Sequence, residues 1–168
     1  MTGKGDKYFG AFVESWFPTY DDALLSNDRP SWWVQGPWVR VWPSDGFSYI
    51  VKGWSDAPIG TQICKAGRTT IRTCGSITGK DETIVVASGE SISHLTRHNA
   101  CVEPGDSGGA SYAFGADGIL AEGVTSAATL ADSDCLEKVG LENQSWYYPI
   151  ADSLAYYGPV HGIELWTG

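Results

Sequence analysis

Glycine and proline interrupt the apolar segments of this 168-residue chain every few positions, with 21 glycines and 8 prolines in all. Long helices tolerate neither residue well, whereas short strands joined by turns require both. Segments with strand character recur at residues 8–17, 23–25, 38–42, 47–54, 59–65, 69–78, 83–88, 91–96, 111–114, 119–126 and 145–149. This spacing predicts an all-β fold, a barrel or a sandwich. One short helix is expected at Ile150–Tyr157.

Composition excludes several classes of partner. The formal net charge is −9 and the 11 Lys and Arg residues are scattered, so we expect no nucleic-acid partner. No apolar run approaches the roughly 20 residues of a membrane-spanning helix, so we expect a soluble chain with no membrane partner.

The two signs of cellular location disagree. Four cysteines form an even set that suits two disulfides and a secreted protein. The first residues lack the features of a signal peptide. We therefore expect that a leader has been removed or that the sequence begins inside a longer protein.

The segment Gly105-Asp-Ser-Gly-Gly109 predicts a nucleophile loop. A serine hydroxyl is a weak nucleophile, so the chain around Ser107 must present it to a base and aim backbone N–H groups at the developing oxyanion. Glycine permits positive φ and a close approach of substrate backbone. The five residues resemble the nucleophile loop of chymotrypsin-like serine peptidases, and the resemblance assigns the oxyanion hole to the amides of Gly105 and Ser107.

Three further segments resemble the streptogrisin and α-lytic protease branch of that family. Residues 64–75, CKAGRTTIRTCG, resemble its cysteine-bracketed hairpin; residues 123–126, GVTS, resemble the strand that lines the primary specificity pocket; and residues 145–157 resemble its C-terminal end. The resemblance covers about residues 10–158 in order. It implies disulfides Cys64–Cys74 and Cys101–Cys135.

The implied fold is a chymotrypsin-like double β-barrel with a short C-terminal helix. Residues 1–44 would be the remnant of the first barrel, with the strand of the triad aspartate and a connecting loop. Residues 45–168 would form the complete second barrel. The exposed edge of a partial barrel is an aggregation risk.

The triad aspartate falls on Asp21 by resemblance, and Asp22 differs from it by one register step. The family's histidine belongs to an Ala-Gly-His-Cys-like segment upstream of this aspartate, and the sequence contains no such segment. We expect structural or solvated roles for His94, His98 and His161. His94 and His98 would suit a metal only on a helix, and their segment predicts a strand, so no metal site and no cofactor are expected.

The resemblance also places the primary specificity pocket. Its floor falls near Asn99 and Ala100, without a carboxylate to pair a basic substrate side chain. Its wall strand has Ser126, Ala127 and Ala128, where relatives often have glycine. Small or medium apolar substrate residues are therefore expected.

The resulting hypothesis is a secreted, monomeric serine endopeptidase that acts on protein or peptide substrates through an acyl-enzyme on Ser107. The sequence as given should be nearly inactive, because it lacks the general-base histidine. A non-catalytic binding module on the same fold is the main alternative, with tryptophans 32, 33, 38, 42 and 54 as a contact surface.

An esterase is a third reading, because GDSGG also satisfies G-x-S-x-G, followed by Asp132 or Asp152 and then His161. That motif requires a helix directly after the serine. Residues 108–118 are glycine-rich and predict strand instead, which argues against an esterase.

Overall fold

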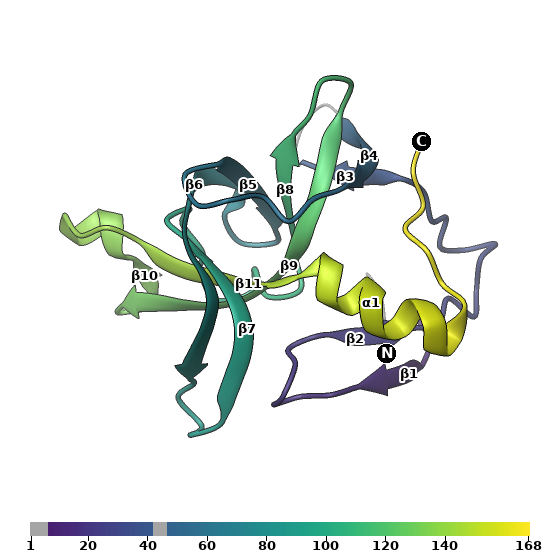
Figure 1. The fold of residues 1–168 in the computed structure, drawn as a ribbon, viewed down its shortest axis with the longest axis horizontal. Helices are drawn as coiled ribbons and strands as arrows, with labels where there is room; N and C mark the ends of the chain where they lie inside the picture. The colour runs from purple at the N-terminus through teal and green to yellow at the C-terminus, as the bar shows by residue number, and fades with distance from the viewer. Residues whose placement is uncertain (1–6, 42–46) are drawn as a thin grey trace.

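The computed structural model describes residues 7–41 and 47–168. Within these ranges the chain is mainly β, with a 3-10 helix and one α-helix (Figure 1). The strands are β1 Phe12–Ser15, β2 Ala23–Leu25, β3 Trp38–Arg40, β4 Ser48–Trp54, β5 Gln62–Gly67, β6 Ile71–Val85, β7 Ser91–His98, β8 Ala110–Phe114, β9 Ile119–Ala131, β10 Asp134–Cys135 and β11 Gln144–Pro149. The 3-10 helix is η1 Leu136–Val139, and the α-helix is α1 Ile150–His161.

Six strands close into a barrel. They are hydrogen-bonded in the order β11-β7-β6-β5-β8-β9, and β9 pairs again with β11 to complete the ring. Closure leaves no free edge within this ring. The complete second barrel expected from the sequence is thereby confirmed. Outside the ring, β4 runs parallel to β9, and β3 pairs antiparallel with β4.

The first-barrel part is a separate two-stranded sheet of β1 and β2 beside α1 (Figure 1). Asp22 fastens it to the helix, since it accepts hydrogen bonds from Ser153 Oγ at 2.5 Å and Tyr157 OH at 3.0 Å. Glu14 accepts a hydrogen bond from Tyr156 OH at 2.9 Å. The boundary expected at residue 44 lies outside the described residues and stays a prediction, as does a strand role for Trp42.

The predicted strands at 69–78 and 83–88 are wrong as two elements, because β6 is one strand of 15 residues. Gly79, Lys80 and Asp81 have turn composition, which misled the sequence reading. The ladder with β7 shifts register on both sides of Gly79, and Asp81 has φ 53°. The turn-like residues are therefore absorbed as bulges within one strand.

Other boundaries also differ: β1 is shorter than the expected 8–17, and β9 runs past the expected residue 126 to Ala131. Residues 59–61 precede β5 in a turn, in which Thr61 N–H bonds Pro58 O at 3.1 Å. The helix runs past its expected end at Tyr157 to His161 and includes Pro159. Gly162 follows as the C-terminal cap, and its φ of 65° is the left-handed conformation typical of such caps. None of the described helices is long and apolar enough to cross a membrane.

The barrel core combines an apolar cluster with fully buried polar groups. Ile63, Ile77 and Ala113 belong to the apolar cluster. The polar side chains exposed by 2% or less include Lys65, Thr96, His98, Asp106, Ser111, Glu122 and Thr125. Lys65, Asp106 and Glu122 have hydrogen-bond partners. Among the described residues, Thr96 Oγ1, His98 Nε2, Ser111 Oγ and Thr125 Oγ1 are buried without one, which is costly for polar groups.

Candidate active site

Ser107 lies in the loop between β7 and β8, exposed at the edge of a cavity of about 450 Å³. The cavity is bounded by residues 105–110 of this loop, by Trp38, Val39 and Arg40 of β3, and by Ala66, Gly67 and Arg68 at the end of β5. The strands of the barrel thus hold a solvent-accessible hydroxyl against a preformed depression. Depressions of this kind are where a substrate segment binds.

Backbone conformation turns the loop sharply on both sides of Ser107. Gly105 has φ 98° and Gly108 has φ 81°, a region that side chains with a Cβ rarely adopt. A Cβ on Gly105 would also lie 2.5 Å from Thr69 Oγ1. The positive φ values explain why this loop has glycine at positions 105 and 108.

The amides of the loop fall into two groups. The N–H groups of Asp106, Gly108 and Gly109 bond the carbonyls of Glu103, Thr125 and Asp106 at 2.9–3.0 Å. In the described part of the chain, the N–H groups of Gly105 and Ser107 have no hydrogen-bond partner. Two free donors therefore flank the buried residue Asp106, next to the exposed Ser107 hydroxyl.

A buried ion pair anchors the loop. Asp106 Oδ2 lies 2.5 Å from Lys65 Nζ, and both side chains are fully buried. Asp106 also accepts hydrogen bonds from Thr70 Oγ1 at 2.7 Å and from the amides of Thr69, Thr70 and Glu103 at 2.8–3.1 Å.

The charge state of Asp106 follows from these contacts. Burial opposes its ionisation, but the hydrogen bonds from Lys65, Thr70 and the backbone outweigh burial and lower the pKa of Asp106 to about 2. The loop is therefore held by a permanent carboxylate. The sequence analysis missed this pair, because strand alternation gives no sign that a lysine in β5 faces inward.

Both expected disulfides are present. Cys64 and Cys74 face each other across β5 and β6, and Cys101 joins the start of the nucleophile loop to Cys135 of β10. One bridge therefore fastens the β5–β6 hairpin, and the other fastens the start of the loop that contains Ser107.

The proposed specificity strand lies next to the nucleophile loop. Thr125 exchanges backbone hydrogen bonds of 2.8–2.9 Å with Gly108 and Gly109, which brings Ser126, Ala127 and Ala128 alongside. These three side chains are half-buried.

The predicted floor residues lie deeper. Ala100 is fully buried against Ile63 and Ile77, and its N–H bonds His98 Nδ1 at 3.2 Å. Asn99 is half-buried and tied to its neighbours, since its Oδ1 accepts from Ser76 N–H at 2.7 Å and its Nδ2 donates to Glu142 at 2.9 Å.

The structure does not join Asp21 to Ser107. Asp21 lies in the turn between β1 and β2. The side chains of Asp21 and Ser107 have no hydrogen-bond partner among the described residues. Asp22, in contrast, has both carboxylate oxygens engaged by α1. Of the two acids, Asp21 is the one whose carboxylate is free to accept a further donor.

None of the three histidines lines the cavity of Ser107. His94 pairs with Asp81 at 3.0 Å, and His161 pairs with Glu14 at 2.6 Å. His98 is fully buried against Tyr147, and desolvation, with a smaller contribution from Lys65, lowers its pKa to about 3. His98 is therefore neutral across the physiological range.

Comparison with known proteins decides the family. The chain is 30% identical over 142 residues to glutamyl endopeptidase 2 of Streptomyces griseus, covering 84% of this chain and 67% of that protein. It is 32% identical over 159 residues to streptogrisin-D of the same organism, covering 95% of this chain and 37% of that protein. The chain belongs to the chymotrypsin-like serine proteases of bacteria.

Solved structures agree with this assignment. Thermobifida fusca protease A matches 95% of this chain and 75% of its own length, with a TM-score of 0.77 and 32% identity. No family model matches the chain. The chain spans 24% to 59% of the length of the first five curated relatives.

Proposed function

We propose that this chain provides the nucleophile and oxyanion hole of a secreted serine endopeptidase. The observation that carries the proposal is the pair of unpartnered amides, Gly105 and Ser107, beside an exposed serine hydroxyl. The amides of Asp106, Gly108 and Gly109 next to them are bonded to backbone carbonyls. Family membership supports the same chemistry.

In this reaction Ser107 Oγ attacks the carbonyl carbon of a peptide bond as its proton passes to an imidazole base. The carbonyl oxygen becomes an oxyanion and accepts hydrogen bonds from the N–H groups of Gly105 and Ser107. The imidazolium then protonates the leaving amine, and water hydrolyses the acyl group from Ser107 by the same steps. The carboxylate of Asp21 would orient the imidazole and stabilise its charged form.

The base is proposed to be a histidine other than His94, His98 and His161. His94 and His161 each contact a carboxylate, His98 is buried, and none of the three lines the cavity of Ser107. The sequence as given should therefore retain only the catalysis due to the oxyanion hole and substrate binding, several orders of magnitude below a full triad.

The half-buried wall of Ser126, Ala127 and Ala128 supports small or medium apolar residues as the preferred cleavage site. The two disulfides support an oxidising, extracellular location. A monomer acting on protein or peptide substrates remains part of the proposal.

Hydrolysis of peptide p-nitroanilides with alanine, leucine or lysine before the cleaved bond tests these statements. We expect a very low rate for the sequence as given and a rate at least about a thousandfold higher for a longer version that includes a histidine segment upstream. The Ser107→Ala variant should remove the activity of the longer version. Full activity of the longer Ser107→Ala variant would contradict the proposal, and a preference for lysine would contradict the apolar pocket.

A further inference from the structure

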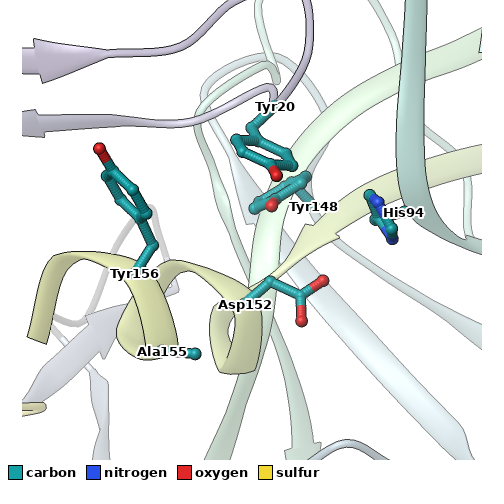
Figure 2. Close-up of a pocket in the computed structure, with 6 residues that line it drawn as sticks. All are labelled: Tyr20, His94, Tyr148, Asp152, Ala155 and Tyr156. Atoms are coloured by element: carbon teal, nitrogen blue, oxygen red, sulfur yellow. The ribbon is translucent and has the colours of Figure 1, made fainter.

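A second cavity, of about 340 Å³, lies between the β1–β2 turn and the start of α1. It shares no lining residue with the cavity of Ser107. We call it the tyrosine pocket, and Figure 2 shows its lining: Tyr20, His94, Tyr148, Asp152, Ala155 and Tyr156.

Three aromatic rings form much of the lining. The rings of Tyr20 and Tyr148 lie 5.8 Å apart at 52°, and Tyr148 is almost fully buried. Tyr156 is held from behind by an edge contact with Trp16 at 5.8 Å and by its hydrogen bond to Glu14. The faces of fixed aromatic rings carry negative potential and attract cations.

The acids and bases around the pocket are of both signs, and most of them are paired with one another. Asp152 is exposed, and among the described residues its carboxylate has no hydrogen bond or ion pair. A neighbouring cavity shares His94 and Asp152 and adds Asp56, Lys80 and Asp81. Lys80 is paired with Asp56, and His94 with Asp81, so the carboxylate of Asp152 is left to bind a cation.

Figure 2 shows how these groups lie. The Asp152 carboxylate extends from the first turn of α1, with the tilted pair of Tyr20 and Tyr148 rings above it and the Tyr156 ring further along the helix. Ala155 adds a methyl group on the lower side of the helix, and His94 lies on the side towards which the Asp152 carboxylate points. A cation next to Asp152 would therefore lie below the rings of Tyr20 and Tyr148, while an anion would be repelled by a chain of net charge −9.

We propose that the tyrosine pocket binds the basic side chain, lysine or arginine, of a polypeptide. The choice of a polypeptide rests on the proposed function, in which the protein acts on polypeptide chains. The choice of a cation rests on the tyrosines and Asp152 alone. The pocket would then hold a substrate or partner chain at a place separate from Ser107.

Binding is tested directly, without an activity assay. The protein, carrying ¹³C on its tyrosine rings, is titrated with N-acetyl-lysine methylamide and N-acetyl-arginine methylamide. The matched neutral probe is N-acetyl-norleucine methylamide, and free butylammonium separates a bare cation from a residue with peptide groups. The variants are Tyr20→Leu and Asp152→Asn, with Asp117→Asn as the control because Asp117 is an exposed acid in the β8–β9 turn.

We expect saturable shifts of the Tyr20, Tyr148 and Tyr156 resonances with at least one basic probe, tighter than with butylammonium, and none with norleucine. Tyr20→Leu and Asp152→Asn should each weaken binding about two- to fivefold, and Asp117→Asn should leave it unchanged. If Tyr20→Leu fails to fold, Asp152→Asn alone carries the comparison.

Equal shifts with norleucine, or equal affinity in Asp152→Asn and the parent, would overturn the proposal. Binding of butylammonium as tight as that of the lysine probe would overturn the polypeptide part. None of these results depends on whether Ser107 is catalytic, so failure here and failure of the proposed function are separate outcomes.

Discussion

Asp106 and Lys65 tie the nucleophile loop to the barrel through a single buried ion pair. A buried ion pair usually stabilises the folded protein no more than apolar residues of the same volume would. Removing one partner is nevertheless strongly destabilising, because it leaves the other charge buried without compensation. The position of Ser107 therefore depends on a residue that is far from it in sequence.

Replacing Lys65 with methionine keeps most of the side-chain volume and removes the charge. We expect the free energy of unfolding, measured by urea denaturation at pH 7, to fall by about 3–5 kcal/mol because Asp106 stays buried without its cation. Arg68→Met, at an exposed cation in the same segment, should change it by less than about 0.5 kcal/mol. Equal effects of the two substitutions would contradict the role of Lys65.

His98 makes stability depend on pH. Its folded pKa of about 3 lies below the ordinary value of 6.5, so between these values the unfolded chain binds a proton that the folded protein does not. Stability contributed by neutral His98 is thus full above pH 6.5 and is lost as the pH falls toward 3.

We expect the urea-derived free energy of unfolding to decrease by up to about 1.4 kcal/mol per pH unit on this account between pH 6 and pH 4. His98→Gln should flatten that dependence. A His98→Gln profile with the parent's slope over this range would contradict the assignment.

At the scale of elements, the sequence predicted the chemistry-bearing loop better than the strand boundaries. GDSGG identified Ser107, Gly105 and Gly108 because positive φ and a short loop have strict residue requirements. Lys65 was missed because four consecutive residues of β5 are buried, so polar and apolar residues do not alternate there. A strand covered on both faces gives no periodic signal.

The β6 error has a related cause. Turn composition at residues 79–81 is compatible with either a turn or a bulge, and only pairing with β7 over the whole barrel decides between them. Asp21 and Asp22 are adjacent acids that the sequence does not distinguish, and the contact that distinguishes their surroundings comes from Ser153 of α1, 131 residues from Asp22. The triad role of Asp21 stays a prediction.

Gly105 and Gly89 have nearly the same φ, so alanine substitutions at the two positions distinguish the cost of backbone strain from the cost of steric crowding. Gly105 has φ 98° with Thr69 Oγ1 close by, and Gly89 has φ 97° with open space around it. Each alanine substitution should cost about 1–2 kcal/mol for the conformation alone. Urea denaturation should show a larger loss in free energy of unfolding for Gly105→Ala than for Gly89→Ala, because Thr69 must also move. Equal losses would show that crowding by Thr69 has no effect.

At the scale of the whole molecule, a closed six-stranded barrel carries Ser107, the free amides beside it and the proposed specificity strand. The β1–β2 sheet carries Asp21 and is tied to the rest through α1. Its side chains Phe12, Trp16 and Phe17 are 45–59% exposed. The barrel is thus closed, whereas the β1–β2 sheet leaves much apolar surface exposed.

The most direct test of the central claim is labelling by a fluorophosphonate probe at pH 8, located by mass spectrometry of peptides. The parent sequence, its Ser107→Ala variant and a longer version that includes a histidine segment upstream are compared. We predict fast labelling only of the longer version, on Ser107, and its loss with Ser107→Ala. Fast labelling of the sequence as given would show that one of its own three histidines is the base, and an absence of Ser107 labelling from every version would contradict the account and favour a binding module on a protease fold.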